Sequence, residues 1–157
     1  MQNKNFFEIF EIPQTYNINE KQLEERFFAL QKQYHPDSSN IENNIISSQI
    51  NISYQTLLNK TKRAAYIINL WYGVDVLQEK TIQNPTILMD ILQIQENFDD
   101  ARNNKDLLRD ITAKIENKRQ TLIQNLGVLL DKKNDETKHE AINEATMLIF
   151  IDKIINK

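Results

Sequence analysis

The sequence contains no cysteine, and only two glycines and three prolines occur among its 157 residues. Without cysteine the chain has no disulfides, no thiolate nucleophile and no cysteine-ligated zinc or iron–sulfur cluster. Few glycines and prolines mean few tight turns, which argues against a β-sandwich, a β-barrel or a glycine-rich phosphate loop. These scarcities favour long, uninterrupted helices.

Histidine occurs only as His35 and His139, which argues against a histidine-rich metal site. The 19 basic and 22 acidic residues give a net charge of −3, so the chain carries no basic footprint for nucleic acid. No apolar run is long enough to span a membrane, and no targeting segment is apparent at the N-terminus. We therefore expect a bacterial-type cytoplasm, or the mitochondrial matrix if a transit peptide has been removed.

Hydrophobic periodicity predicts helices in the first half of the chain. A short apolar helix ends at Pro13, and a second begins at the capping residue Asn19 and ends before Pro36. The residues 37–43 that follow read as a loop. The second and third helices each carry one apolar stripe that faces a core, made of Leu23, Phe27, Leu30 and Tyr34, and of Ile46, Ile50, Tyr54 and Leu57.

The third helix is expected to be interrupted by Lys60–Arg63 and to continue over 64–72, ending at Gly73. Asn84 followed by Pro85 is a strong helix start, since the first caps and the second suits the first helical position. Helices are then expected over 85–100, 104–131 and 135–156. The predicted fold is all-α, with a helical-hairpin domain over 1–73, a linker over 74–84 and a three-helix bundle over 85–157.

The tripeptide His35, Pro36 and Asp37 joins two helices that we expect to be antiparallel. Two short polar side chains beside a restricting proline suit a preorganised contact with charged groups of a partner. Spacing alone favours a simpler interpretation, in which Asp37 starts a turn and His35 ends a helix. A catalytic interpretation lacks a third group, because no nucleophile accompanies the imidazole and the carboxylate.

The helix over 85–100 carries two apolar rows. Ile87, Ile91, Ile94 and Phe98 are sufficient to face a core, whereas Leu88, Met89 and Leu92 lie about 100° further round the helix. Either the helix is buried between two others, or the second row is an exposed partner surface flanked by Glu96. Similarly, the segment 147–151 is apolar on every side, and one core stripe leaves Phe150 or a neighbour unaccounted for.

The segment Arg26-Phe27-x-x-Leu30-Gln-Lys-Gln-Tyr34-His-Pro-Asp resembles the HscB family, which pairs a J-domain with a C-terminal three-helix bundle. Two further segments extend the resemblance over nearly the whole chain: Arg63-Ala64-x-Tyr66-Ile-Ile-x-Leu70 and Leu88-Met89-x-x-Leu92-x-x-x-Glu96. The resemblance implies a J-type co-chaperone that is not an enzyme. It would stimulate the ATPase of a seventy-kilodalton heat-shock chaperone of the HscA type, and deliver the scaffold protein IscU to it during iron–sulfur cluster assembly and transfer.

The same resemblance assigns the binding residues and implies no cofactor and no metal, because the hydrolytic residues belong to the partner chaperone. Gln93 stands where the family usually has an acidic residue, so this position would not supply the charged client contact that the resemblance otherwise implies. Two alternatives stay open, namely a J-domain protein with a different client and a non-catalytic helical adaptor. The chaperone-binding residues would be His35, Pro36, Asp37, Arg26 and Lys32, and the client-binding residues Leu88, Met89, Leu92, Glu96 and Phe150.

Overall fold

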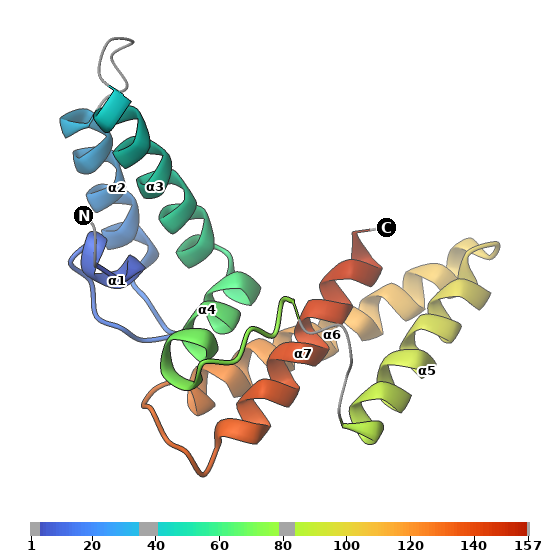
Figure 1. Cartoon of the computed structure of the whole chain (residues 1–157). Helices are drawn as coiled ribbons and strands as arrows, with labels where there is room; N and C mark the ends of the chain where they lie inside the picture. Colours follow the sequence, from blue (N-terminus) through green and yellow to red (C-terminus); the bar gives the residue numbers. More distant parts are fainter. Residues whose placement is uncertain (1–3, 35–40, 79–83, 157) are drawn as a thin grey trace. The chain divides into compact units, whose positions relative to one another are not determined.

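The structure, a computed structural model, describes residues 4–34, 41–78 and 84–156, and helices are the only regular elements among them (Figure 1). The chain divides into two compact units, Met1–Arg63 and Ala64–Lys157. The division falls within one helix, so this helix contributes residues to both units. The helices are α1 (Phe6–Ile9), α2 (Glu20–Gln33), α3 (Ile41–Leu58), α4 (Lys60–Tyr72), α5 (Pro85–Ala101), α6 (Lys105–Leu129) and α7 (Lys138–Ile155).

In the first unit, α1 and α2 both pack against α3. Asn5 and Glu8 form a capping box that starts α1, and the Asn19 side chain accepts a hydrogen bond from the Gln22 amide at the start of α2. The largest side chains of the core are fully buried and come from α1, the α1–α2 connection, α2 and α3. They include Phe7, Phe10, Tyr16, Leu23, Ile50 and Leu57.

The expected apolar stripes of α2 and α3 do meet. The rings of Phe27 and Tyr54 stack with centroids 4.0 Å apart, which joins the middles of the two helices. Leu23 is fully buried, whereas Phe27, Leu30 and Tyr34 become partly exposed towards the end of α2. The helix ends at Gln33, as expected from the proline that follows.

Two predicted boundaries in the first unit are wrong. The short first helix stops at Ile9 rather than running to Pro13, because Glu11 takes a left-handed backbone conformation with φ +52°. The segment Lys60–Arg63 is not an interruption but the first turn of α4. The Asn59 side chain accepts a hydrogen bond of 2.9 Å from the Lys62 amide, so Asn59 caps this new helix.

In the second unit, α5, α6 and α7 pack pairwise as a three-helix bundle. Asn84 and Asn104 cap α5 and α6 through their side chains, while α7 begins at Lys138, three residues later than expected. The core is apolar and includes Ile91, Ala101, Leu122, Leu126, Leu148 and Ile151. The all-helical architecture with a three-helix bundle is therefore confirmed.

The C-terminal part of α4 packs with the bundle. Tyr72 donates a hydrogen bond of 2.9 Å to the Asn134 carbonyl through its hydroxyl, and Lys138 lies over its ring at 5.5 Å. Gly73 ends α4 with φ +68°, a conformation that favours glycine. Val76 is buried, so part of the segment expected to be a linker packs in this unit. The domain boundaries at 73 and 85 stay a prediction.

Candidate functional site

The first candidate surface lies on α2, upstream of the tripeptide. His35, Pro36 and Asp37 fall outside the described residues, whereas Lys32 is exposed in the last turn of α2. Arg26 is half exposed, and its guanidinium lies 3.2 Å from the Glu11 carboxylate. Arg26 and Lys32 are six positions apart in sequence, which places them about 120° apart around the helix. The structure therefore does not bring these two cations onto one face.

The first unit also exposes a row of isoleucines on α3 that was not among the candidate residues predicted from the sequence. Ile41, Ile45 and Ile52 on α3 are 77%, 64% and 59% exposed. Their spacing places them within about 40° of one another, opposite the stripe that faces the core. This second row could have been found from the sequence by the same test that separated the two rows of the helix over 85–100.

The Arg63 side chain links several buried parts of the first unit, and we call its contacts the Arg63 brace. It is 3% exposed, and its Nη1 donates a hydrogen bond of 2.6 Å to the Leu57 carbonyl in the last turn of α3. The guanidinium also lies 5.2 Å from the centre of the Tyr16 ring and 4.0 Å from the Glu20 carboxylate. Burial lowers the pKa of Arg63 from its ordinary value, and the Tyr16 hydroxyl and Glu20 oppose that shift. The brace thus joins α2, α3, α4 and the α1–α2 connection.

The second candidate surface lies on α5, where the structure decides between two interpretations. Ile91 is buried and Ile87, Ile94 and Phe98 are partly buried, so this row faces the bundle. The other row is not covered by a helix, because Leu88, Met89 and Leu92 are 39%, 71% and 57% exposed. The interpretation of α5 as a helix buried on both sides is therefore wrong, and three apolar side chains reach the surface. Glu96 is exposed beside them.

In α7 the segment 147–151 leaves Phe150 as its partly exposed member. Its neighbours Met147, Leu148, Ile149 and Ile151 are all buried. The Lys153 ammonium lies 4.9 Å from the centre of the Phe150 ring, which places a positive charge over that ring. Phe150 is thus the side chain that the core stripe leaves out.

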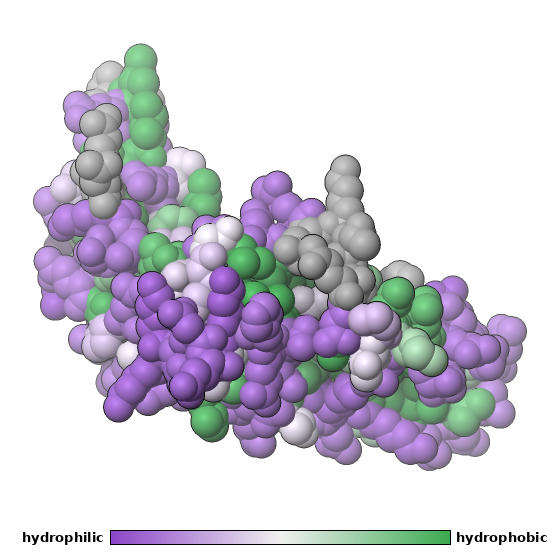
Figure 2. Space-filling model, turned by 60° about the horizontal axis from the view of Figure 1, so that its bottom comes forward, coloured by the Kyte–Doolittle hydropathy of each residue, from purple (hydrophilic) through white to green (hydrophobic). Residues whose placement is uncertain are grey.

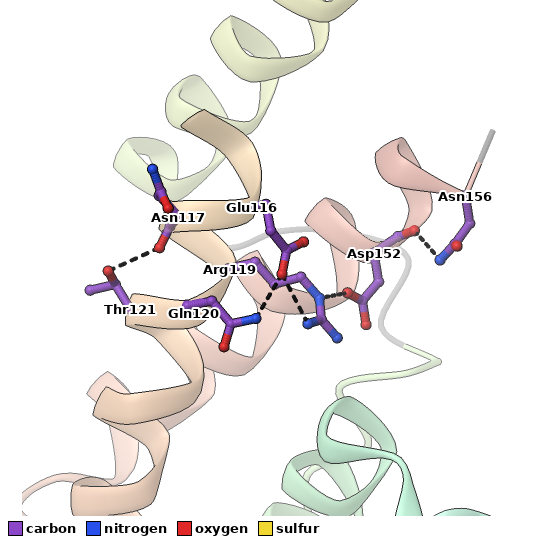
Figure 3. A network of polar contacts seen from close by, with 7 residues as sticks. All are labelled: Glu116, Asn117, Arg119, Gln120, Thr121, Asp152 and Asn156. Atoms are coloured by element: carbon purple, nitrogen blue, oxygen red, sulfur yellow. Dashed lines mark hydrogen bonds and ion pairs between the residues drawn. The ribbon is translucent and has the colours of Figure 1, made fainter. Parts of the chain in front are cut away.

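The polar network in Figure 3 fixes how α7 lies along α6. Arg119 donates a hydrogen bond of 2.7 Å to the Asp152 carboxylate through Nε, and its Nη1 lies 3.6 Å from Glu116. This hydrogen bond to Asp152 raises the pKa of Arg119 above its ordinary value, against the effect of partial burial. Because Asp152 follows Phe150 by two residues, the ion pair between Arg119 and Asp152 holds Phe150 close to the level of Arg119.

The α5 row lies at a similar level of the bundle. Ile94 and Asn97 share a pocket with residues 111–118 of α6. Because a short turn makes α5 and α6 antiparallel, Leu88 and Leu92 lie at the same level along the bundle axis as about residues 117–121 of α6. Leu88, Leu92 and Phe150 therefore lie at similar levels along the axis of the bundle. Client binding by Leu88, Met89, Leu92, Glu96 and Phe150 stays a prediction from the family resemblance, and for that predicted role we call these five side chains the client surface.

The exposed apolar side chains on these surfaces suit contacts with another protein. In the part of the chain that the structure describes, no group of three or more His, Asp or Glu side chains is placed to hold a metal ion. Nor is any helix among those residues long and apolar enough to cross a membrane. On the face shown in Figure 2, hydrophobic residues reach the surface in separate patches among hydrophilic ones. Exposed apolar patches with a polar rim are typical of protein-binding sites.

Comparison with known proteins finds two family matches, one in each half of the chain. Residues 5–66 match the DnaJ domain family, and residues 83–157 match the HscB C-terminal oligomerisation domain family. The chain is 30% identical over 158 residues to the Co-chaperone protein HscB homolog of Burkholderia mallei, covering 94% of this chain and 88% of that protein.

Two solved structures have a similar fold. The chaperone HscB from Vibrio cholerae superimposes with a TM-score of 0.77 at 26% identity, covering 98% of this chain and 94% of that one. The human co-chaperone protein HscB gives a TM-score of 0.82 at 19% identity, covering 99% and 81%. These likenesses extend over both units. The chain therefore belongs to the HscB family of J-domain co-chaperones.

Proposed function

We propose that this co-chaperone stimulates the ATPase of a seventy-kilodalton heat-shock chaperone of the HscA type and delivers the scaffold protein IscU to it. Three exposed apolar side chains on α5 carry the second half of the proposal, because a three-helix bundle alone gives no reason to leave them uncovered. Met89 is an adaptable contact residue of the kind that such surfaces use. The client surface would therefore bind IscU during iron–sulfur cluster assembly and transfer.

The chaperone contact is assigned to the first unit. Membership of a J-domain family supports a role for His35, Pro36 and Asp37 in triggering hydrolysis by the partner. Lys32, exposed on α2, would steer the encounter with an acidic patch of the chaperone. Arg26 would contribute less to that steering, since Glu11 already offsets its charge.

The proposed mechanism is a tether. The chain contributes no hydrolytic group, and the reaction takes place in the partner chaperone. Holding the client and the chaperone on one chain makes their meeting effectively intramolecular and raises the local concentration of client. We propose a J-domain over 1–73, a linker over 74–84 and a client-binding bundle over 85–157, acting in a bacterial-type cytoplasm or in the mitochondrial matrix.

Single-turnover ATP hydrolysis by an HscA-type chaperone tests the proposal directly. We expect this chain to accelerate hydrolysis, and we expect added IscU to increase the acceleration further. Acceleration without an effect of IscU would support the J-domain function and assign a different client. No acceleration at all would contradict the proposal and leave the helical adaptor as the better account.

The client surface makes a separate prediction. Replacing Leu92 or Phe150 by Ala is expected to weaken IscU binding by about tenfold, because truncating an anchor at an interface typically costs more than 1 kcal/mol. Since Leu92 is 57% exposed, Leu92→Ala should change stability by less than about 1 kcal/mol, whereas Phe150→Ala should cost more because its ring is only partly exposed. Isothermal titration calorimetry measures the affinity, and thermal unfolding measures the stability.

Val128 provides the matched control for these two variants. It is an apolar residue of the same unit, 78% exposed near the end of α6 and outside the client surface. The Val128→Ala variant should bind IscU with unchanged affinity. A loss of several kcal/mol of stability in Leu92→Ala would instead show that this side chain belongs to the core.

A further inference from the structure

A small pocket lies on the seam between α5 and α6, away from the client surface. Its volume is about 130 Å³. Leu92 of the client surface and Asn97 of the pocket are five positions apart in sequence, which places them about 140° apart around α5. The two sites therefore face different directions. The pocket is lined by Ile94, Asn97, Ile111, Lys114, Ile115 and Lys118.

The size of the pocket limits what it can hold. Pockets for drug-sized ligands and cofactors typically measure about 300–1,000 Å³, well above this volume. A cavity of about 150 Å³ with aliphatic walls is large enough for benzene. The pocket therefore fits one branched aliphatic or aromatic side chain. Ile94, Ile111 and Ile115 supply an apolar lining for it.

Two lysines line the rim of the pocket on its α6 side. Lys114 and Lys118 are exposed and lie one turn apart on α6, and neither forms an ion pair with any residue that the structure describes. Asp110, one turn before Lys114, lies 3.8 Å from Arg109 instead. Arg119, next to Lys118, pairs with Asp152 on the side that faces α7. The two lysines are thus available to carboxylates of a partner.

We propose that the α5–α6 pocket docks an acidic segment of a partner protein through one anchoring apolar side chain. The anchor enters among the three isoleucines, and carboxylates on either side of it pair with Lys114 and Lys118. Leu107, 43% exposed one turn before Ile111, extends the apolar surface for the rest of the segment. Because the pocket and the client surface face different ways, both can be occupied at once, and this site does not depend on the identity of the client.

Nuclear magnetic resonance titration of the full chain tests the site. The probe is a capped synthetic peptide with the sequence Gly-Ser-Asp-Ile-Glu-Ser-Gly, added to isotope-labelled protein at low salt. We expect saturable shifts at the methyl groups of Ile94, Ile111 and Ile115, with a Kd on the order of 1 mM for so short a peptide. Replacing the peptide's isoleucine by glycine, or its acidic residues by lysine, should weaken binding by about tenfold or more.

Two double variants distinguish the effect of charge at the rim of the pocket from the effect of the net charge of the chain. The Lys114→Glu, Lys118→Glu double variant should bind the acidic peptide about tenfold more weakly, whereas Lys132→Glu, Lys133→Glu changes the net charge equally and should bind normally. Equal affinity for the acidic and basic peptides would overturn the proposal, as would no shifts at the three isoleucines. Sodium isovalerate is tested alongside, and if it matches the peptide in affinity the site takes small carboxylates and the proposal of a protein partner is wrong.

Discussion

Replacing His35 by Gln is expected to lower stimulation of the partner ATPase by about tenfold or more, with no change in stability. The reason lies in the sequence around it. Proline restricts its own φ and disfavours helical geometry in the residue before it, so we expect Pro36 to lower the cost of ordering the imidazole and the Asp37 carboxylate on binding. Glutamine keeps a polar side chain but loses the geometry of the imidazole, so the loss should appear in hydrolysis and not in folding.

His139 provides a control with the same chemical change. It is exposed near the start of α7, in the unit that carries the client surface, so His139→Gln should leave stimulation unchanged. IscU affinity should be unchanged in both variants, because neither histidine lies on the client surface. If His35→Gln lowered the melting temperature by several degrees, the lost stimulation would reflect a damaged fold, and the role of His35 in the chaperone contact would not stand.

Local sequence signals predict several of the helix ends that the structure confirms. Asn19 and Asn84 cap the helices that they were expected to start, and Gly73 ends the one that it was expected to end. These signals act within one turn of the chain, so sequence alone carries them. Glu11 shows the limit, since nothing in a short apolar stretch predicts a left-handed conformation at a glutamate.

The two apolar rows of α5 show which part of a site needs tertiary structure. Periodicity separates the rows, but it does not say whether a neighbouring helix covers the second one. Only the packing of α6 and α7 decides this, and it leaves Leu88, Met89 and Leu92 exposed. The basic residues of α2 show the opposite case, because the geometry of a single helix separates Arg26 from Lys32 whatever packs against it.

Arg63 stands out among the basic residues because it is buried. It lies in the segment Lys60–Arg63, which was expected to interrupt the third helix. Yet it lies one turn before Ile67, beside Ala64, and both of these are fully buried. Its place on the apolar face of α4 therefore indicated that Arg63 is buried. Its charge argued against burial, because Arg is rarely buried without a partner.

The Arg63→Ala variant is expected to destabilise the first unit by about 3 kcal/mol, since truncation leaves the buried Leu57 carbonyl without its donor and opens a void beside Tyr16. Arg63 Nε lacks a hydrogen-bond partner among the described residues, so part of the desolvation cost of the guanidinium is not offset, and this limits the stability that the truncation removes. Native-state hydrogen exchange measures the effect, because it reports on each helix separately. Amides of α2 and α3 should lose protection by about a hundredfold, while those of α6 and α7 should keep theirs.

Two further variants identify what the brace contributes. Arg63→Met keeps an apolar stem but cannot donate to Leu57, so it should lose about half as much stability as Arg63→Ala. Glu20→Gln removes the exposed partner at 4.0 Å and should cost no more than about 0.5 kcal/mol. Equal losses in Arg63→Met and Arg63→Ala would assign the whole effect to the hydrogen bond. Unchanged protection of α2 and α3 in Arg63→Ala would show that the first unit does not depend on this brace, and that the packing of Phe7, Phe10 and Leu23 is sufficient to hold it.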